Sequence, residues 1–235
     1  MAAGMDNKTI SIDLNGVKIM LEYPKIETLY QRDKTTDKVI INQLRLPESG
    51  NICRWQITEK VDGTNVRVGL LPGGVIKYSG RTENAQIPAR LLGYLQQTFT
   101  LEQLQLVFKD SPDSEVVLFG EGYGEKIHGG GAYRQGISFR LFDVLVDQWW
   151  LEPNAIADIA AKLGILTVPL LGEIDSLPSQ VDELKQWLGH DGNSTVAIQD
   201  GGRGVRAEGI VARTVPLLFT RRGQRLMWKL KFCDF

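Results

Sequence analysis

The chain has 235 residues and a mass of 26.2 kDa, and its 27 basic and 28 acidic residues give a formal net charge of −1. This length is sufficient for one large domain with a single core. Two cysteines, Cys53 and Cys233, are too few for a disulfide framework and suit a reducing compartment. No apolar run approaches the ~18 residues of a membrane span, and the N-terminus lacks a secretory apolar core. We therefore expect a soluble, cytoplasmic protein without membrane attachment.

The first part of the chain is predicted to form β-hairpins. Alternating residues 9–14 and 17–23 lie on either side of the hairpin signal Asn15-Gly16. Further strand-like segments, separated by Asp62-Gly63 and by Pro72-Gly73-Gly74, are residues 55–59, 65–71 and 75–79.

Helices and strands alternate along the rest of the chain. The apolar spacing predicts helices over 88–99, 101–108, 153–163 and 179–188, with Ser179 as N-cap of the last and Gly164 ending the third. Predicted strands are 116–120, 138–146, 209–213, 215–219 and 225–232. Residues 122–136 are too rich in glycine to be a core element, and a loop is expected. The pattern favours one α+β domain over residues 1–235.

A set of short motifs occurs in a fixed order along this chain. Each is unspecific by itself, because Asp-Gly, for instance, is also a common hairpin turn. In chain order they are Lys60-Val61-Asp62-Gly63-Thr64-Asn65, Ser79-Gly80-Arg81, Phe119-Gly120-Glu121-Gly122, Phe139-Arg140-Leu141-Phe142-Asp143, Glu208-Gly209-Ile210-Val211 and Lys229-Leu230-Lys231.

The ordered set resembles the covalent nucleotidyltransferases, the superfamily of polynucleotide ligases and messenger-RNA capping enzymes. Within it, the chain looks most like the short RNA ligases of the phage RNA ligase 2 type, and the resemblance extends over residues 23–235. It implies the nucleotidyltransferase (ATP-grasp-like ligase adenylation) fold, with largely antiparallel sheets flanking a nucleotide cleft and helices outside. ATP and a divalent metal, Mg²⁺ or Mn²⁺, are the implied cofactors.

The resemblance implies that Lys60 is the nucleophile that forms a phosphoramidate with AMP. An attacking amine must first lose its proton, and burial or nearby cations can lower the ordinary lysine pKa of about 10.4. Asp62 is expected on the same strand face as Lys60, and Gly63 allows a close backbone approach. Asn65 matches an asparagine that acts near the phosphate during sealing. An exposed hairpin lysine is the structural alternative for this segment alone.

The other motifs supply expected contacts with the nucleotide and the metal. The resemblance implies that Arg81 contacts the ribose and phosphate and that Glu121 contacts ribose hydroxyls or the metal. It also implies that Phe142 stacks on adenine, so Phe139 is expected in the core. Glu59 is a weaker candidate for the adenine edge. Glu208 is expected to bind the divalent metal. Two further expected catalytic residues, which would grip the triphosphate from one strand face, are Lys229 and Lys231.

Positive charge is concentrated near the C-terminus, where residues 203–231 contain eight basic residues and the single acid Glu208. This strip is typical of a phosphate-binding face, although a solvated surface balanced by acids elsewhere in the fold is the alternative. Arg221, Arg222 and Arg225 cluster at a predicted hairpin turn around Gly223. Further nucleic-acid contacts are expected from Lys126 and Arg134 in the glycine-rich loop, which a flexible solvated loop would explain equally well.

The sequence thus predicts an ATP-dependent RNA ligase that works through lysyl-AMP on nicked duplex or broken RNA ends, in RNA repair. No oligonucleotide-binding barrel follows Lys231 in these 235 residues. We therefore expect RNA to be bound by the domain itself or by a protein partner. A minimal ATP-dependent DNA ligase and an inactive nucleotide-binding or nucleic-acid-binding module are the alternatives.

Overall fold

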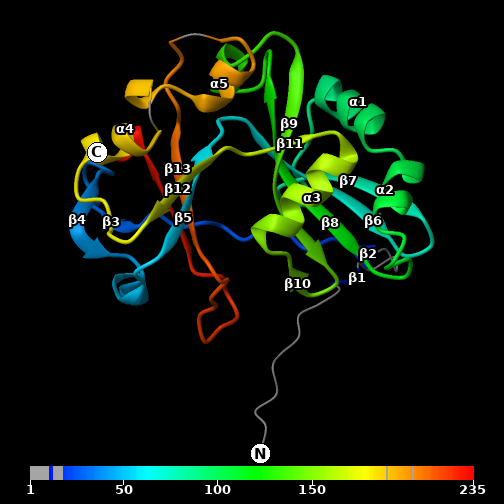
Figure 1. The fold of residues 1–235 in the computed structure, drawn as a ribbon, viewed down its shortest axis with the longest axis horizontal. Coiled ribbons are helices and arrows are strands. Elements are labelled where there is room, and N and C mark those ends of the chain that lie inside the picture. Colours follow the sequence, from blue (N-terminus) through cyan, green and yellow to red (C-terminus); the bar gives the residue numbers. More distant parts are fainter. Residues whose placement is uncertain (1–10, 13–17, 189, 203) are drawn as a thin grey trace, which may run out of the picture. The chain divides into compact units, whose positions relative to one another are not determined.

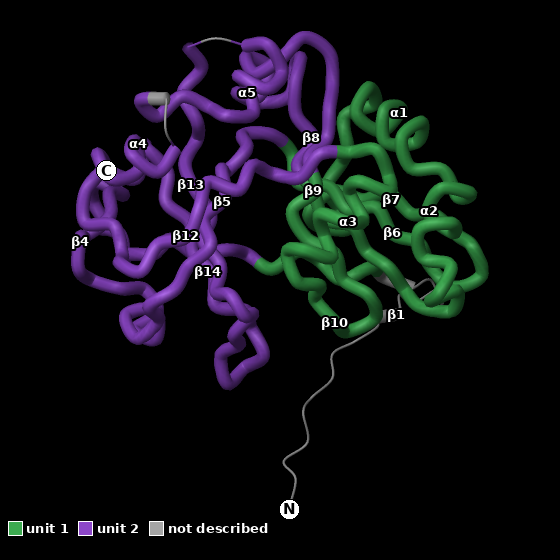
Figure 2. The backbone as a smooth tube through the Cα atoms, viewed as in Figure 1, with its two compact units in different colours: residues 1–24, 64–120, 141–165 green, residues 25–63, 121–140, 166–235 purple. Residues whose placement is uncertain are grey.

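The computed structural model describes residues 11–12, 18–188, 190–202 and 204–235. The chain forms two compact units (Figure 2). Unit 1 comprises residues 1–24, 64–120 and 141–165, and unit 2 comprises residues 25–63, 121–140 and 166–235. The chain therefore passes from one unit to the other inside three of the motifs, between Gly63 and Thr64, between Gly120 and Glu121, and between Arg140 and Leu141. A single nucleotidyltransferase domain over residues 1–235 stays a prediction.

Most of a six-stranded sheet belongs to unit 1 (Figure 1). Its strands follow the order β10 (Trp149–Trp150), β9 (Ile137–Val146), β8 (Val116–Gly124), β6 (Thr64–Leu71) and β7 (Val75–Gly80), and β11 (Leu166–Thr167) also pairs with β9. β6 and β7 are a hairpin in which Val66 faces Gly80 and Leu71 faces Val75. Its turn uses Gly73 and Gly74 at positive φ, as the sequence predicts.

The predicted N-terminal hairpin is present where the structure describes it. β1 (Ser11–Ile12) pairs antiparallel with β2 (Lys18–Ile19), while residues 9–10 and the Asn15-Gly16 turn lie outside the described residues. Residues 20–23 continue without strand structure.

Three predicted helices belong to unit 1, namely α1 (Ala89–Thr98), α2 (Leu101–Val107) and α3 (Pro153–Leu163). A capping box between Thr100 and Gln103 starts α2. Gly164 ends α3 in the left-handed conformation at φ 67°, which confirms its predicted place after the helix.

A four-stranded antiparallel sheet, in the order β12 (Leu170–Ile174), β5 (Trp55–Lys60), β13 (Gly209–Thr214) and β14 (Met227–Lys231), forms the centre of unit 2. Residues 27–29 cover the outer edge of β14, through a parallel bridge between Thr28 and Lys229. The hairpin of β3 (Tyr30–Arg32) and β4 (Val39–Leu44) follows in the chain.

One face of the unit 2 sheet is apolar, because strand side chains alternate between faces. Cross-strand partners Ile57, Ala212 and Trp228 are all buried, and they join a core cluster with Leu184 and Leu188 of α4 (Val181–Leu188). This packing directs the alternate residues, which include Lys60, Lys229 and Lys231, to the opposite face.

Short helices complete unit 2. They are α5 (Thr195–Gln199) and 3-10 helices over Pro47–Asn51, Gly129–Ala132, His190–Gly192 and Phe232–Asp234. None of the helices in the described ranges combines the length and apolarity of a membrane span.

Several predicted elements are wrong. Residues 215–219 form no strand, because Pro216 cannot donate to a ladder, and only an isolated bridge joins Phe219 to Arg225. The helix predicted from Ser179 begins at Val181, and the carboxylate of Glu183 accepts the backbone N–H groups of Ser179 and Gln180. β3, β4, β12 and α5 were not expected from the sequence.

The expectation that residues 122–136 lie outside the core is also wrong. β8 continues through Gly124 into this segment. The side chains of Tyr123, Ile127 and Tyr133 are buried, with exposed fractions of 0%, 3% and 2%. Tyrosine and isoleucine thus supply the apolar surface that the glycines lack, and the segment packs as part of unit 2.

Candidate active site

A row of residues across three strands of unit 2 forms the base of the candidate site. In the sheet register, Lys60 of β5 faces Gly209 of β13, and Gly209 faces Lys231 of β14. A Cβ atom on Gly209 would lie 2.1 Å from the backbone oxygen of Leu230 and 2.7 Å from Cα of Lys231. The middle position of the row therefore accepts only glycine, and two lysines flank it.

Glu208, directly before this glycine, connects the two lysines. Its Oε1 lies 2.6 Å from Nζ of Lys231, and its Oε2 pairs with Nζ of Lys60. The three side chains keep 17–29% of their surface exposed, so that they are sheltered but reachable. Two ammonium groups and one carboxylate leave a net charge of +1, which suits an anionic ligand.

The backbone of Lys231 is fixed by a hydrogen bond to the side chain of Asp234. Its backbone N–H donates to Asp234 Oδ2 at 2.8 Å, and the buried Asp234 carboxylate also accepts from Arg32 of β3 at 2.5 Å. Burial lowers the pKa of the Lys231 amine, but its hydrogen bond to Glu208 and the charge of that carboxylate outweigh burial and raise the pKa. Lys231 is therefore a charged group at neutral pH.

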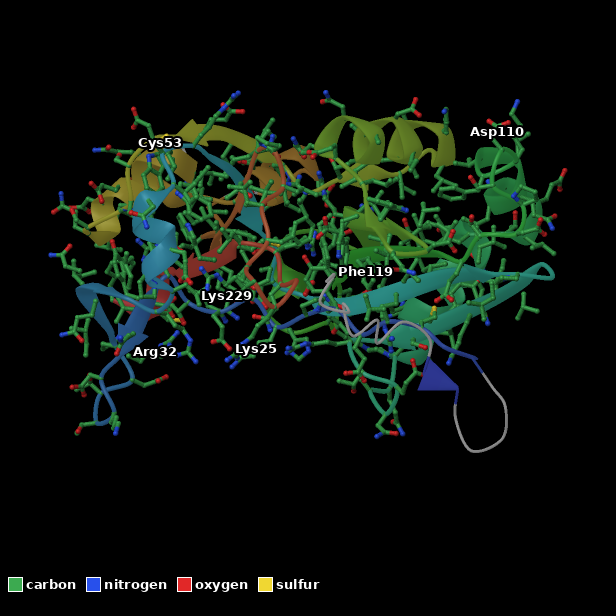
Figure 3. The ribbon with its side chains drawn as sticks, turned by 90° about the horizontal axis from the view of Figure 1, so that it is seen from below. Lys25, Arg32, Cys53, Asp110, Phe119 and Lys229 are labelled. Atoms are coloured by element: carbon green, nitrogen blue, oxygen red, sulfur yellow. The ribbon has the colours of Figure 1, made fainter. Side chains whose placement is uncertain are left out.

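Lys229 lies two residues earlier on β14 and faces the same side as Lys231, as the sequence predicts. Its backbone is fixed in the sheet edge, where its oxygen accepts from Leu29 N–H at 3.1 Å and its N–H donates to Glu27 O at 3.1 Å. Figure 3 labels Lys229 on β14 and Arg32 on β3. It also labels Cys53, which, like Cys233, is a free exposed thiol.

The turn after Lys60 packs against the glycine-rich segment. A Cβ on Gly63 would lie 2.4 Å from the backbone oxygen of Gly122, and one on Gly130 would lie 2.0 Å from that of Asp62. On Gly129 it would lie 2.1 Å from the Asp62 carboxylate. Glycine is thus required on both sides of this contact, because backbone meets backbone there. The arrangement fixes the chain that leaves Lys60.

Glu121 lies next to this turn, and its environment disfavours a charged carboxylate. Burial raises its pKa to about 8; Lys60 opposes the shift, whereas the negative charges of Glu208 and Asp62 add to it. A hydrogen bond from the Gly63 backbone also favours the ionised form. The structure therefore brings Lys60, Asp62, Glu121 and Glu208, which come from three separate motifs, into one electrostatic cluster.

Glu59 occupies the opposite face of β5 from Lys60 and is 1% exposed. Its carboxylate accepts from the Ser194 hydroxyl and from the backbone N–H groups of Thr195 at 2.8 Å and Val196 at 3.2 Å. Burial raises its pKa, while these hydrogen bonds lower it. Glu59 thus anchors the start of α5, and its expected contact with the adenine edge stays a prediction.

With this geometry in place, comparison with known proteins identifies the chain's relatives. A family model described as RNA ligase matches residues 54–231, a range that contains all of the residues just described except Arg32, Cys53, Cys233, Asp234 and residues 27–29. The chain belongs to the RNA ligase family. No curated protein gives a match to the sequence.

Solved structures of RNA ligases have the same fold. An RNA ligase of Naegleria gruberi with pyrophosphate (PPi) aligns with a TM-score of 0.59 and 20% identity, over 89% of this chain and 61% of that one. A variant of that ligase with ATP and Mn aligns with a TM-score of 0.56 and 20% identity, over 80% of this chain and 54% of that one. The chain thus spans 54–61% of the length of these relatives. The similarity shows the nucleotidyltransferase-type α+β fold that the sequence predicts.

Three residues expected at the nucleotide of this RNA ligase family member belong to unit 1. Asn65 follows the first residue of β6, and its side-chain oxygen is buried without a hydrogen-bond partner among the described residues. Arg81 is exposed directly after β7. Phe142 is half-buried, whereas Phe139 is buried, as the sequence predicts for a core residue.

An aromatic group beside Phe142 was not expected from the sequence. The ring of Tyr23 lies 4.9 Å from that of Phe142, edge to face, and 5.2 Å from that of Phe119. The Tyr23 hydroxyl donates to the buried Asp143 at 2.5 Å. Asp143, the last residue of its motif, therefore fixes the ring that borders Phe142.

The basic strip of residues 203–231 is not one continuous surface. Arg213 is buried and donates to Gln56 Oε1 at 3.0 Å, and Arg206 lies 4.5 Å over the ring of Phe232. Arg203 lies outside the described residues. The predicted turn at Gly223 is confirmed by its φ of 72°, with Arg221 and Arg222 exposed and Arg225 half-buried.

Lys126 and Arg134, both in the glycine-rich segment, differ in exposure and in their contacts. Lys126 is exposed at a positive φ of 64°. Arg134 is half-buried and lies 3.7 Å from the carboxylate of Asp200. Asp200 also accepts from the Tyr123 hydroxyl at 2.7 Å. Arg134 therefore has a structural partner, and Lys126 is the better placed of the two for an external ligand.

Proposed function

We propose that this chain is the adenylyltransferase part of an ATP-dependent RNA ligase, with Lys60 as the residue that carries AMP. The single observation that supports this most strongly is the linked set Lys60–Glu208–Lys231, in which a nucleophile candidate, a metal-ligand candidate and a phosphate-binding candidate meet. Membership of the RNA ligase family supports RNA as the proposed substrate class. The related Naegleria structures with ATP and Mn, and with pyrophosphate, support ATP as the donor.

The charges of the site fit a nucleoside triphosphate. Lys231 and Lys60 flank Gly209 in the sheet register, and Lys229 follows on the same strand face as Lys231. Ammonium groups are point charges suited to phosphate oxygens, which spread over several positions in a triphosphate. We propose that Lys229 and Lys231 hold the β- and γ-phosphates, which places the α-phosphate toward Lys60.

The donor set also fits a divalent metal of the Mg²⁺ type. No group of three or more Asp, Glu, His or Cys residues with metal-binding geometry occurs in the part of the chain that the structure describes. Mg²⁺ typically uses one or two carboxylates together with substrate phosphates and water. Glu208 and Glu121 would supply those carboxylates, and the metal would neutralise charge on the phosphates and on the departing pyrophosphate.

The ion pair with Glu208 defines a resting form of Lys60. An ammonium group in such an ion pair has no lone pair for attack on phosphorus. Lys60 must therefore leave Glu208 and lose a proton before it reacts. Once Lys60 has left it, the Glu208 carboxylate would be available to hold the divalent metal together with Glu121, and the metal would supply charge neutralisation at the phosphates.

The proposed reaction has three transfers. The neutral amine of Lys60 attacks the α-phosphorus of ATP, a P–N bond forms, and the bond to pyrophosphate breaks. An oxygen of an RNA 5′-phosphate then attacks the same phosphorus, and the P–N bond breaks to restore the amine. A 3′-hydroxyl finally attacks the RNA phosphate, and AMP leaves. Each step relies on positioning and charge neutralisation.

The remaining assignments rest on motif position. We propose Asn65 for phosphate contact during sealing, Arg81 for ribose and phosphate, and Phe142 for stacking on adenine; the buried, unpartnered oxygen of Asn65 supports a ligand or water contact. The proposed substrates are nicked duplex or broken RNA ends, in repair of RNA. A protein partner for substrate grip and a cytoplasmic location stay predictions.

The test is transfer of label from α-³²P-ATP to the protein, resolved on a denaturing gel with and without Mg²⁺ or Mn²⁺. Wild-type protein, freed of bound AMP, should be labelled only with metal; Lys60→Ala should lose labelling. Lys34→Ala, which removes an exposed lysine from the β3–β4 turn, is the matched control and should label normally. An unlabelled wild type would favour an inactive binding module, and parallel sealing assays on nicked RNA and DNA would reveal a DNA ligase.

A further inference from the structure

A defined hairpin connects β13 to β14 and projects beyond the ends of both strands (Figure 1). At its base, Leu218 N–H donates to Thr214 Oγ1 and Leu226 N–H donates to Leu218 O, each at 2.8 Å. At its tip, Thr220 N–H donates to Gln224 O at 2.7 Å, and Gly223 N–H donates to Thr220 O at 2.9 Å. The backbone of this hairpin is therefore fixed, although its side chains point outward.

Those side chains combine apolar surface with positive charge. Phe219 is 49% exposed and Leu218 is 39% exposed. Large apolar side chains of this kind are more often buried in the core of a folded protein. Arg221 and Arg222 are exposed, and within the described ranges no carboxylate pairs with either of them. Residues 214–226 contain three arginines and no acidic residue.

Paired arginines elsewhere in unit 2 show the contrast. Arg54 holds Glu173 at 2.8 Å, Arg45 holds Glu27 at 3.0 Å, and Arg32 holds Asp234. The solvated-surface alternative requires nearby acids to balance the strip, and the hairpin tip lacks them. An exposed ring beside unbalanced arginines matches the chemistry that binds single-stranded nucleic acid, in which bases stack on aromatics and phosphates meet cations.

We propose that residues 218–225 form a contact site for single-stranded RNA, in which Phe219 stacks on a base and Arg221 and Arg222 bind backbone phosphates. The proposal rests on the proposed function for the identity of the nucleic acid. The proposed site adds a stacking residue, Phe219, and it is a second RNA-binding site, separate from the Lys60–Glu208–Lys231 set. RNA is favoured over a protein partner because the hairpin has charge of one sign only.

The two kinds of contact respond differently to salt, so that they can be separated. Phosphate contacts release counterions, and each one contributes about 0.7 to the slope of log affinity against log salt on a single strand. Stacking is nearly independent of salt, and loss of one platform weakens binding by roughly 5- to 100-fold. The hairpin should therefore show two distinguishable mutant phenotypes.

The experiment is fluorescence anisotropy of a labelled, 5′-phosphorylated single-stranded RNA with the full chain, over a series of salt concentrations. Phe219→Ala should weaken binding by roughly 5- to 100-fold at every salt concentration with an unchanged slope, and Phe219→Trp should retain binding. Arg221→Ala/Arg222→Ala should reduce the slope by about 1.4. Trp149→Ala, which removes a ring that is 76% exposed in unit 1, is the control and should bind as wild type.

Label transfer from ATP, measured on the same samples, reports folding and separates the two proposals. Wild-type affinity and slope in both hairpin variants, with labelling intact, would overturn the RNA site and leave the ligase proposal standing. A wild type that binds RNA through the hairpin but takes no label would overturn only the ligase proposal. A wild type that binds no RNA would overturn the site directly.

Discussion

Glu208 Oε1 lies 2.6 Å from Nζ of Lys231, and the other oxygen of the same carboxylate pairs with Lys60. One acidic side chain therefore neutralises part of the charge on a proposed phosphate-binding lysine and on the proposed nucleophile. The motif places this glutamate directly before Gly209, the residue that faces both Lys60 and Lys231 in the sheet register, so that one carboxylate reaches both lysines.

Glu208→Gln should lower the rate of labelling by ATP at least about 100-fold, the scale on which removal of one electrostatic contact to a transition state acts. The amide keeps the shape of the side chain but neither attracts a metal nor balances two ammonium groups. Rates measured over a Mg²⁺ titration test this. Glu173→Gln, which alters an exposed carboxylate paired with Arg54, should label normally. A Glu208→Gln rate within threefold of wild type would remove Glu208 from the mechanism.

Asp234→Ala should destabilise the protein by roughly 2–3 kcal/mol, since it removes charged hydrogen bonds from Arg32 and from the Lys231 backbone. Asp37→Ala offers a matched control, because Asp37 also pairs with Arg32, at 3.4 Å, but its side chain is 85% exposed. That change should cost less than about 0.5 kcal/mol. Urea unfolding measures both values. Equal costs would mean that Asp234 does not fix the end of β14.

Gly130→Ala should slow labelling at least about tenfold, because its Cβ would lie 2.0 Å from the backbone oxygen of Asp62 and displace the turn after Lys60. Gly129→Ala should be milder, since the atom it meets is the side-chain oxygen of Asp62, which can move. In Gly131→Ala the nearest atom would lie at 3.4 Å, an ordinary contact, and labelling should stay normal. The same rate in all three variants would contradict this packing account.

Glu121→Gln should flatten the dependence of stability on pH. Burial raises the pKa of Glu121 to about 8 from an ordinary value of 4.5, so the folded protein binds this proton more tightly than the unfolded chain. Its contribution to stability is complete below about pH 4.5 and is lost as pH rises through about 8. Unfolding free energies at pH 5 to 8, without nucleotide or metal, test this. Glu125→Gln, an exposed control, should leave the wild-type profile unchanged. Identical profiles in both variants would refute the raised pKa.

Much of the framework could be predicted from the sequence, since its signals are local. Alternation predicts the strands around Lys60 and the shared face of Lys229 and Lys231, and Gly164 ends α3 where expected. The supporting contacts could not be predicted in this way. Arg32 and Asp234 are 202 positions apart in the chain, and no local pattern connects them.

The errors have physical causes as well. The sequence analysis predicts a strand over residues 215–219, but Pro216 prevents one. Composition suggested a mobile loop over residues 122–136, whereas Gly129 and Gly130 are needed for close packing on Asp62. A run of glycines between buried tyrosines is the signal that could have indicated this contact.

The most direct test of the central claim is to locate the adenylate on the protein. Wild-type protein incubated with ATP and Mg²⁺ should be digested and its peptides sequenced by tandem mass spectrometry. The account predicts a single adenylated peptide with the modification on Lys60, and none after Lys60→Ala. Adenylate on Lys229, Lys231 or another residue, with Lys60 unmodified, would contradict it.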